Sequence, residues 1–348
     1  MSSLVNRRIL LWLGPLALTS LLTVEVAPVA AQTKTTAAKP AATKAAAKKP
    51  GAKRPVVSRR VRLARARAAA TAREIADTAL PRYKVDGSGD LVPDLRAAAG
   101  IVYDADTNEI LWQENADTQR SIASITKVMT AIVFLEENPD LTRQVLVTRA
   151  DTLRASTTLL RTGDKWALDD ILHLMLIASD NAAARVIART SPRGYQGFIA
   201  RMNEKAAELG LESTHYVDTS GLLNENLSSA IDMARLITLA SQNEQISSIM
   251  RLPEYTVKNT RRTVTFRSTN YLVRAGDVDV RAGKTGFITK AGYCLATVLR
   301  LPQTGQNIAV VVFGARSNAA RFMESRNLFN WVSAKASTLF SAKAQGQD

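Results

Sequence analysis

The chain has 348 residues and a formal net charge of +15, because 46 Lys and Arg residues outnumber 31 Asp and Glu residues. Two histidines and one cysteine provide neither the usual ligands of a zinc site nor an internal disulfide, and we expect no metal and no cofactor. A charge this high would suggest a nucleic-acid-binding protein. Residues 1–73, however, hold 15 of the basic residues and one acid, and the other 275 residues carry a net charge of +1. We therefore expect no nucleic acid partner.

The first 31 residues have the layout of a secretory signal peptide. Arg7 and Arg8 form a short cationic start, residues 9–24 are apolar, and small residues precede the expected cleavage after Ala31. The alternative is a retained transmembrane anchor, but the apolar run has about 16 residues where a membrane span needs about 20. We expect cleavage and export to the periplasm, where peripheral association with the membrane or wall is an open alternative.

Residues 32–90 form a basic linker that is rich in Ala, Lys and Pro and poor in large apolar side chains. Such a segment cannot bury enough apolar surface to offset its ordering entropy, so we predict that it is largely disordered. Within it, the Ala- and Arg-rich residues 61–79 favour a basic helix. In an exported protein the linker would either bind anionic envelope polymers and lipid head groups or serve as a solvated spacer.

Residues 91–335 carry the periodic patterns of a folded domain, and residues 336–348 are a short tail. Two alternating runs around Asp106 predict a β-hairpin. Apolar residues at helical spacing then predict helices at residues 125–135, 168–178 and 182–189, and over "GYQGFIARMNEKAAELG" and "SSAIDMARLITLAS". In the last stretch, the spacing of Ser229 and Asp232 predicts a capping box.

Three strands follow, in "RAGKTGFI", "GYCLATVLRL" and "NIAVVVFGA", and a final helix begins near Asn318. The strands are apolar on both faces, so we expect layers on both sides of the sheet. Because the early hairpin and the late strands come from opposite ends of the domain, we expect one sheet with a helical insertion between its parts.

Ser124 is the only serine that is followed by a lysine three residues later, in "SITK". At the start of a helix this spacing places both side chains on one face. A serine hydroxyl needs a base to become a nucleophile, and with so few histidines Lys127 would be that base. The lysine pKa would then have to fall from about 10.4 to about 7, through burial and a nearby cation. On its own, the pattern more often marks a capping serine beside a solvated lysine.

Two further motifs favour the interpretation of Ser124 and Lys127 as a catalytic pair. The pattern SxN occurs four times, but only Ser179-Asp-Asn181 lies in a short break between two apolar helices. The triplet Lys284-Thr285-Gly286 is the only KTG in the chain, and it opens a strand. The order SxxK, SDN, KTG is the signature of penicillin-binding proteins and serine β-lactamases.

Longer segments carry the same resemblance. The stretches "RSIASITKVMTAIVFLE", "LMLIASDNAAARVIA", "YVDTSGLLNENLSSAIDMARL" and "GKTGFITKAGYCLATV" resemble the D-alanyl-D-alanine carboxypeptidase and endopeptidase family of low-molecular-mass penicillin-binding proteins. The resemblance covers residues 97–334 and is greatest to the penicillin-binding protein 7 type of endopeptidase. It implies an α/β (α+β) fold of the β-lactamase/transpeptidase type, with an antiparallel sheet covered by helices on both faces and a helical subdomain.

The resemblance also implies the catalytic roles. Ser124 would attack the carbonyl of a D-alanine residue and become acylated, and Lys127 would take its proton. Ser179 would relay a proton toward the leaving amine. Water would then hydrolyse the acyl-enzyme, without a metal or a cofactor.

Five more residues would bind the substrate. Asn181 would hydrogen-bond its chain, Lys284 would keep the pocket positive, and Thr285 would contact a carboxylate. Gly286 would leave room for the substrate along its strand. The backbone N–H of Phe287 would form the oxyanion hole together with that of the nucleophile.

The resemblance leaves several activities open. Class A β-lactamases need a glutamate in an ExxLN segment, which the sequence lacks between SDN and KTG. Many family carboxypeptidases carry a second β-domain and an amphipathic C-terminal anchor, and we expect neither here because the sequence stops soon after the last helix. This favours an endopeptidase that cleaves D-alanyl–meso-diaminopimelate cross-links of peptidoglycan, with β-lactams as covalent inhibitors. The alternatives are a carboxypeptidase that trims pentapeptide stems and an inactive envelope-binding relative, against which the complete motif set argues.

Overall fold

The computed structural model describes residues 59–258 and 261–344. The predicted signal peptide and the first part of the basic linker, residues 32–58, lie outside these residues. Among the described residues, no helix is both long enough and apolar enough to span a bilayer.

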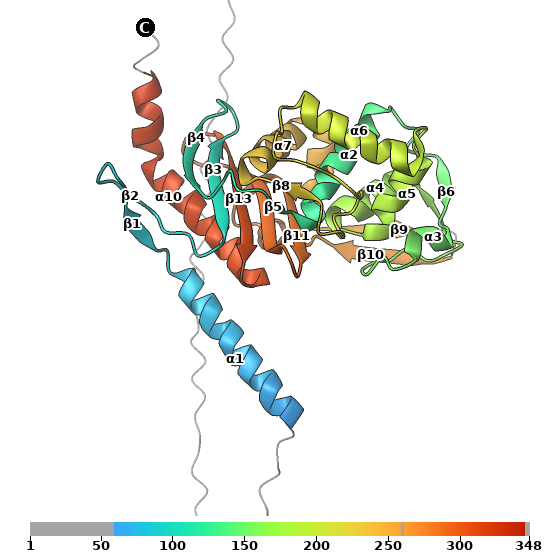
Figure 1. Cartoon of the computed structure of the whole chain (residues 1–348), viewed down its shortest axis with the longest axis horizontal. Helices are drawn as coiled ribbons and strands as arrows, with labels where there is room; N and C mark the ends of the chain where they lie inside the picture. The colour runs from blue at the N-terminus through green and yellow to red at the C-terminus, as the bar shows by residue number, and fades with distance from the viewer. Residues whose placement is uncertain (1–58, 259–260, 345–348) are drawn as a thin grey trace, which may run out of the picture. The chain divides into compact units, whose positions relative to one another are not determined.

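A five-stranded antiparallel sheet in the order β11-β12-β13-β3-β4 forms the centre of the domain (Figure 1). Its strands are β3 (Ala99–Asp104), β4 (Ile110–Glu114), β11 (Asp279–Ile288), β12 (Gly292–Arg300) and β13 (Asn307–Ala315). Strand β13 pairs with β3, so the early hairpin and the late strands complete one sheet. The predicted fold is confirmed in this respect.

Helices cover both faces of the sheet, as the apolar strands predicted. Helix α10 (Asn318–Ala344) lies against one face, and α7 (Ala230–Gln242) and α8 (Glu244–Met250) lie against the other. Alternate residues of β13 divide between the two sides. Val311 and Phe313 belong to the core under α7, whereas Val310 and Val312 belong to the core under α10.

Six of the remaining helices form the predicted helical subdomain. They are η1 (Ala123–Ile125), α2 (Thr126–Glu136), α3 (Arg149–Thr152), α4 (Leu168–Ile177), α5 (Asn181–Thr190) and α6 (Gly194–Glu208). Four short strand pairs and one short helix complete the described fold: β1 (Tyr83–Val85) with β2 (Leu91–Pro93), β5 (Arg120–Ser121) with β8 (Leu227–Ser228), β6 (Gln144–Leu146) with β7 (Lys165–Ala167), β9 (Glu254–Lys258) with β10 (Thr263–Arg267), and α9 (Tyr271–Ala275).

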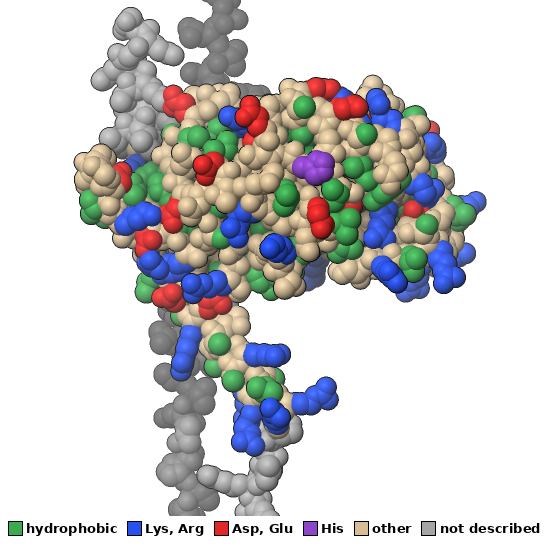
Figure 2. Space-filling view, in the orientation of Figure 1, with side chains coloured by type: hydrophobic (Ala, Val, Ile, Leu, Met, Phe, Trp, Pro, Cys, Tyr) green, Lys and Arg blue, Asp and Glu red, His purple; other side chains and the backbone are tan. Residues whose placement is uncertain are grey.

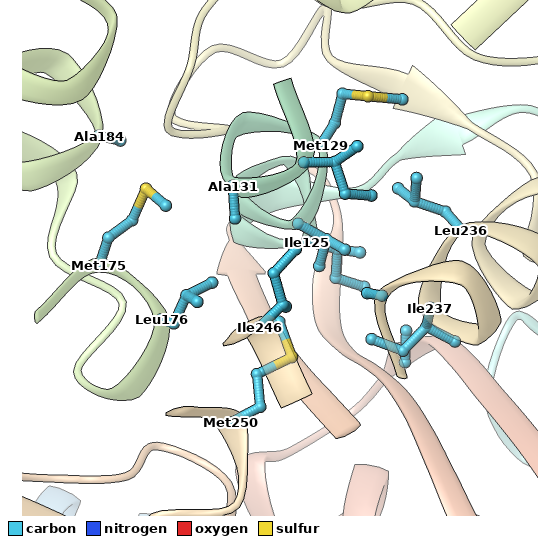
Figure 3. Close-up of a cluster of buried hydrophobic side chains, with 14 of the residues drawn as sticks. Ile125, Met129, Ala131, Met175, Leu176, Ala184, Leu236, Ile237, Ile246 and Met250 are labelled. Atoms are coloured by element: carbon cyan, nitrogen blue, oxygen red, sulfur yellow. The ribbon is translucent and has the colours of Figure 1, made fainter. Parts of the chain in front are cut away.

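Helix α2 is buried on every side, which is the expected place for a helix that is apolar all round. In Figure 3, Ile125 and Met129 lie among side chains of α4, α7 and α8, including Met175 and Leu236. A close-packed core of this kind resists small displacements. The N-terminus of α2, where the SxxK motif lies, is therefore held firmly in place.

The structure confirms the basic helix that was predicted at residues 61–79, as helix α1 (Arg59–Ala79). Strand β1 also lies within residues 32–90, so ordered structure begins before residue 91. The helix has many Ala and Arg residues, which are strong helix formers. The turn before β2 is closed by Asp86, whose carboxylate accepts hydrogen bonds from the backbone N–H groups of Ser88 and Asp90. At the other end, α10 continues past residue 335 to Ala344.

The predicted capping box of α7 is only half present. The Ser229 side chain accepts a hydrogen bond from the Asp232 N–H, as expected for an N-cap. The Asp232 carboxylate instead accepts hydrogen bonds from the N–H of Ser213 and the hydroxyl of Thr214. The Asp232 carboxylate thus binds Ser213 and Thr214 and does not complete the capping box with Ser229.

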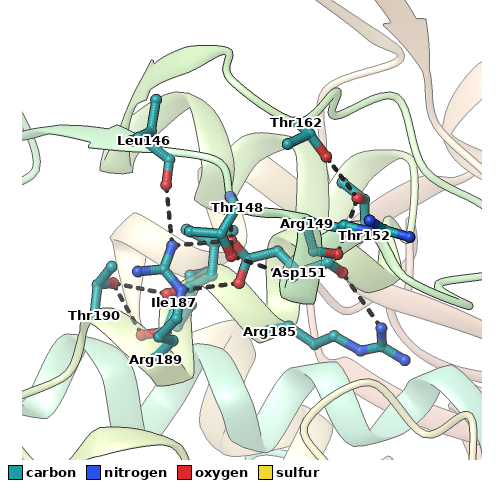
Figure 4. A network of polar contacts seen from close by, with 11 residues as sticks. Leu146, Thr148, Arg149, Asp151, Thr152, Thr162, Arg185, Ile187, Arg189 and Thr190 are labelled. Atoms are coloured by element: carbon teal, nitrogen blue, oxygen red, sulfur yellow. Dashed lines mark hydrogen bonds and ion pairs between the residues drawn. The ribbon is translucent and has the colours of Figure 1, made fainter.

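A buried carboxylate anchors the segment that follows α3 (Figure 4). Asp151 accepts hydrogen bonds from the N–H and hydroxyl of Thr148 at 2.7 and 2.8 Å and from Arg189 at 2.9 Å through each of its oxygens. Arg185 donates to the carbonyl oxygens of Asp151 and Leu153 at 3.3 and 2.6 Å. These contacts hold the start of residues 153–163, which form a wall of the cleft described below.

We expect the substitution Asp151→Ala to lower the free energy of unfolding by about 3 kcal/mol, because it removes the carboxylate half of the capping box of α3 and leaves the Arg189 charge without its partner. Urea denaturation would measure the loss. Asp140→Ala is the matched control, since Asp140 also caps a turn through a nearby threonine but is exposed. A loss for Asp151→Ala no larger than for this control would refute the assignment.

Candidate active site

The turn before α2 brings the nucleophile and the base of the SxxK motif together. Ser124 lies in η1, Lys127 lies in the first turn of α2, and the Lys127 Nζ is 2.9 Å from the Ser124 Oγ. Ala123 adopts a φ of 49°, in the left-handed region that is unfavourable for a residue with a Cβ. A Cβ on Gly221 would lie 1.8 Å from the Ala123 carbonyl oxygen. Only glycine at this position therefore lets the two segments approach so closely.

Lys127 is fully buried, and its contacts suit an uncharged amine. Besides Ser124, its Nζ contacts the Asn181 Oδ1 at 2.7 Å and the Ser220 carbonyl oxygen at 2.6 Å. A neutral amine has two N–H groups and one lone pair. Because these two oxygens can only accept, they take both N–H groups and leave the lone pair for the Ser124 hydroxyl. Lys127 is thus oriented to receive the serine proton.

Burial lowers the pKa of Lys127 to about 7, and the charges of Asp218 and Asp180 partly oppose this shift. The Arg185 guanidinium acts in the same direction as burial. A lysine that acts as the base was predicted to need such a fall in its pKa. A proton acceptor with a pKa near the working pH is well matched to general base catalysis.

The SDN and KTG motifs meet opposite the nucleophile. Ser179 lies in the break between α4 and α5, with a φ of 61°. Lys284, on the edge strand β11, donates to the Ser179 Oγ at 2.6 Å and to the Thr285 carbonyl oxygen at 3.0 Å. Burial, with smaller effects of the Lys127 and Arg321 charges, places the pKa of Lys284 well below its ordinary value.

Asn181 and Thr285 have protein partners of their own. The Asn181 amide nitrogen donates to the Ala155 carbonyl oxygen at 2.8 Å, while its oxygen accepts from Lys127. Asn181 thus ties the cleft wall to the base. The Thr285 hydroxyl donates to the Thr269 hydroxyl at 2.7 Å.

The structure gives Gly286 a role beyond the predicted one. A Cβ on Gly286 would lie 2.7 Å from the Ile122 carbonyl oxygen and 3.2 Å from the Ser124 nitrogen. The glycine therefore lets the turn that carries the nucleophile pack against β11, and it also lines the cleft. This contact places the Ser124 nitrogen beside Gly286, whose neighbour in the chain, Phe287, is the second predicted donor of the oxyanion hole.

A cleft of about 560 Å³ opens over these groups. Six of the eight predicted site residues line it: Ser124, Ser179, Asn181, Thr285, Gly286 and Phe287. The other two, Lys127 and Lys284, are buried behind the two serines that they contact. Among the described residues, no group of three or more His, Cys, Asp or Glu side chains could hold a metal ion.

Comparison with known proteins identifies the family. The profile of the D-alanyl-D-alanine carboxypeptidase family matches residues 88–317. The chain belongs to this family. It is therefore a serine-type D-alanyl-D-alanine peptidase, and the resemblance seen in the motifs is confirmed.

Relatives in the family include both endopeptidases and carboxypeptidases. The D-alanyl-D-alanine endopeptidase of Escherichia coli is 32% identical over 244 residues, which are 69% of this chain and 78% of the relative. That of Pseudomonas aeruginosa is 32% identical over 259 residues, or 73% and 83% of the two chains. A D-alanyl-D-alanine carboxypeptidase of a Streptomyces species is 28% identical over 260 residues, or 69% and 88%.

Solved structures of the family share the fold. The DD-transpeptidase of Streptomyces K15 aligns with a TM-score of 0.66 at 28% identity, over 70% of this chain and 98% of that one. The D-alanyl-D-alanine carboxypeptidase of Mycobacterium tuberculosis aligns with a TM-score of 0.64 at 26% identity, over 70% and 93%.

Sequence analysis of the peptidase missed Asp218, although its segment contributed to the resemblance. The Asp218 carboxylate accepts hydrogen bonds from the N–H groups of Ser220, Gly221 and Leu223 at 2.5, 2.7 and 2.8 Å. Burial raises the pKa of Asp218, but these hydrogen bonds outweigh it and keep the pKa below its ordinary value. Asp218 thereby shapes the loop whose Ser220 carbonyl holds Lys127.

Two more residues were missed because their contacts are long-range. Asp180, the central residue of SDN, caps α5 through the N–H of Ala183 and also accepts a hydrogen bond from the Leu159 N–H at 2.6 Å, which fixes the cleft wall. Arg321 of α10 reaches the cleft and donates to the carbonyl oxygens of Gly286 and Cys294 at 2.9 and 3.2 Å. No local pattern in the sequence signals the contact of Asp180 with Leu159 or those of Arg321.

We expect the rate of acylation by a fluorescent penicillin to rise with pH through an apparent pKa near 7, because only neutral Lys127 can accept the Ser124 proton. Rate constants measured between pH 5 and 9 would show the rise. A lysine with an ordinary pKa would keep the rate rising to about pH 10. Ser124→Ala provides the blank without acylation, and a rate that does not change with pH would contradict the role of Lys127.

We also expect Gly221→Ala to slow acylation about 100-fold, because the new Cβ must displace the turn that carries Ser124, and a misplacement of about 1 Å has an effect of this size. Gly210→Ala is the matched control. Gly210 has a similarly positive φ of 64°, but a Cβ there meets nothing within 4 Å. The same acylation rate in both variants would show that the close approach does not position Ser124.

Proposed function

We propose that the protein is a D-alanyl-D-alanine endopeptidase that hydrolyses D-alanyl–meso-diaminopimelate cross-links of peptidoglycan. The serine peptidase chemistry rests on one observation above all. A fully buried lysine, whose pKa burial lowers to about 7, has its Nζ 2.9 Å from the Oγ of a serine in an open cleft. The endopeptidase specificity is supported by relatives of that name from Escherichia coli, Pseudomonas aeruginosa and Haemophilus influenzae, at 32–33% identity.

In the proposed reaction, the Ser124 Oγ attacks the carbonyl carbon of the D-alanyl residue while the Lys127 Nζ takes the hydroxyl proton. The N–H groups of Ser124 and Phe287 stabilise the oxyanion, a contribution of about 3 kcal/mol per donor. The C–N bond then breaks as Ser179 gives its proton to the leaving amine and is reprotonated from Lys127, which becomes neutral again. Lys127 next takes a proton from the water that attacks the ester and returns it to the departing Ser124 Oγ, which releases the acid and free Ser124.

The positions of the two lysines support different roles. Lys127 contacts the nucleophile, whereas the Lys284 Nζ lies 2.6 Å from the Ser179 Oγ. A donor at this distance polarises the Ser179 hydroxyl and favours transfer of its proton to the amine. Thr285 presents its hydroxyl to the same cleft, where it would contact a substrate carboxylate.

A carboxypeptidase that trims pentapeptide stems is the alternative activity. Carboxypeptidases of the family are 27–31% identical to this chain. The two activities share the acyl-enzyme and differ in the leaving amine, which is a free D-alanine in one case and a cross-linked diamino acid in the other. The rates of cleavage of the two substrates therefore distinguish the endopeptidase from the carboxypeptidase.

We expect purified protein to convert cross-linked muropeptide dimers to monomers faster than it releases D-alanine from pentapeptide monomers. Chromatography of both digests at equal substrate concentrations would measure the two rates. Penicillin-treated protein is the control and should leave both substrates intact. Release of D-alanine without loss of dimers would establish the carboxypeptidase instead.

We further propose that residues 1–31 direct the protein to the periplasm and that the basic linker, residues 32–90, binds polyanions of the envelope. Helix α1 supports this second proposal, because its six arginines are exposed and precede its first acid, Glu74. They are Arg59, Arg60, Arg62, Arg65, Arg67 and Arg73. Figure 2 shows these basic side chains along the helix. Such a surface attracts anionic polymers or lipid head groups through charge alone.

We expect full-length protein to co-sediment with isolated cell envelopes more strongly than protein that lacks residues 32–73, with a difference that shrinks as salt rises. The variant Arg62→Glu, Arg65→Glu, Arg67→Glu tests the charge without shortening the chain and should bind like the deletion. Equal sedimentation of all three proteins would show that the basic linker is a spacer and does not bind the envelope.

A further inference from the structure

The loop of residues 217–226 lies along the first turns of α2 and contacts the catalytic base. The Lys127 Nζ donates a hydrogen bond to the Ser220 carbonyl oxygen at 2.6 Å. One residue earlier in the loop, the Thr219 carbonyl oxygen accepts a hydrogen bond from the Thr130 hydroxyl at 2.7 Å. This part of the 217–226 loop therefore helps to hold the amine of the base in its orientation.

The rest of the same loop contacts the turn that carries the nucleophile. Gly221 lies against the Ala123 carbonyl oxygen, so closely that only glycine fits. The Ile122 N–H, two residues before Ser124, donates a hydrogen bond to the Asn226 carbonyl oxygen at 3.1 Å. One loop thus contacts both the base and the turn of the nucleophile, and its shape affects how the two meet.

The Asn226 side chain joins the parts of the 217–226 loop to one another. Its Oδ1 accepts hydrogen bonds from the N–H groups of Val217 and Asp218 at 3.1 and 3.3 Å. Its Nδ2 donates to the Asp218 Oδ2 at 2.9 Å and to the Leu223 carbonyl oxygen at 3.1 Å. These four hydrogen bonds use both N–H groups and both oxygen lone pairs of the amide. The beginning, the middle and the end of the loop are therefore held together by one side chain.

Asn226 cannot act on the substrate directly. It is fully buried, and the lining of the cleft includes Gly221 and Leu222 of the loop but not Asn226. Burial of an amide is unfavourable unless its hydrogen bonds are formed, and here all four are formed within the loop. The side chain can therefore influence the reaction only through the loop that it holds.

We propose that Asn226 is a positioning residue of the peptidase reaction, which fixes the 217–226 loop so that the Ser220 carbonyl oxygen orients the Lys127 amine toward Ser124. The Ser220 oxygen takes one of the two N–H groups of the neutral amine, and this leaves the lone pair for the serine proton. The inference rests on the proposed reaction, in which Lys127 is the base.

Loss of the Asn226 side chain should raise the pKa of Lys127. Burial lowers this pKa to about 7, and a loosened loop would admit water to the amine and weaken the effect of burial. The charged groups that act on Lys127 are Asp218, Asp180, Arg185 and Lys284, and Asn226 bonds directly to the first of them. Without that bond the Asp218 charge favours the ammonium form more strongly. Both effects have the same sign, so less of the amine would be neutral at pH 7.

The test compares Asn226→Ala with a matched control, Asn203→Ala, by acylation with a fluorescent penicillin between pH 5 and 9. Asn203 binds the carbonyl oxygens of Ile199 and Tyr216 and the Tyr216 N–H, but none of these bonds reaches Lys127 or the turn that carries the nucleophile. We expect the apparent pKa of acylation to rise by about one unit in Asn226→Ala. This shift alone lowers the rate about fivefold at pH 7 and hardly at all at pH 9. Asn203→Ala should keep the apparent pKa near 7.

Asn226→Asp is the second variant, and it decides the test if Asn226→Ala does not fold. It keeps the size of the side chain and the oxygen that accepts from Val217 and Asp218, but it replaces the donating Nδ2 by a carboxylate oxygen. Its apparent pKa should also rise. A folded variant that acylates more slowly but keeps an apparent pKa near 7 would show that Asn226 has only a structural role, and would overturn the proposal.

The wild-type protein separates this inference from the proposed reaction. If the wild type is not acylated, or its rate does not change with pH, the assignment of Lys127 as the base fails. The pKa of Lys127 is then measured by NMR of protein with isotope-labelled lysine ε-carbons, in which Lys127→Ala identifies the signal by its loss. A higher pKa in the Asn226 variants than in the wild type supports positioning of the amine by Asn226, and an equal pKa overturns it.

Discussion

A lysine amine enclosed by protein is the constraint on which the rest of the structure depends. Lys127 can lose its proton near neutral pH only while water is kept from its Nζ, because burial disfavours the ammonium form. Helix α2 meets this condition with apolar residues on all its faces. The core around α2 therefore has a chemical function as well as a structural one, since it sets the proton affinity of the base.

Two buried carboxylates partly offset the effect of burial on the Lys127 pKa without contacting the Lys127 amine. Asp218 and Asp180 both favour the charged form of Lys127, yet neither forms an ion pair with it in the described structure. Their oxygens are engaged by backbone N–H groups instead, and each thereby shapes one loop beside the cleft. A direct ion pair would raise the lysine pKa further and weaken the base. The two loops thus hold these carboxylates close enough to Lys127 to order the site, but they prevent an ion pair that would keep Lys127 protonated.

The sequence predicts the parts of this site that depend on local spacing. The three-residue separation of Ser124 and Lys127, the helix break at Ser179 and the strand at Lys284 are all visible as patterns, and the sheet follows from apolar strands at both ends of the domain. What the sequence does not reveal is long-range contact. The contacts of Arg321 with Gly286 and of Asp180 with Leu159 depend on segments that meet only in the folded chain. Gly286 shows the difference well, because its motif was recognised but its neighbour, the turn at Ile122, was not.

The pairing of β13 with β3 has a consequence for the order in which the peptidase can assemble. These partners, centred near residues 310 and 102, are about two hundred residues apart, and long loops of this kind close slowly. The nucleophile turn must also wait for β11, since Gly286 packs directly against it. A chain that emerges from its N-terminus therefore carries its serine for most of its synthesis without a working base or oxyanion hole. The enzyme is inert until nearly all of the domain has emerged, so the architecture itself delays hydrolysis until folding is complete.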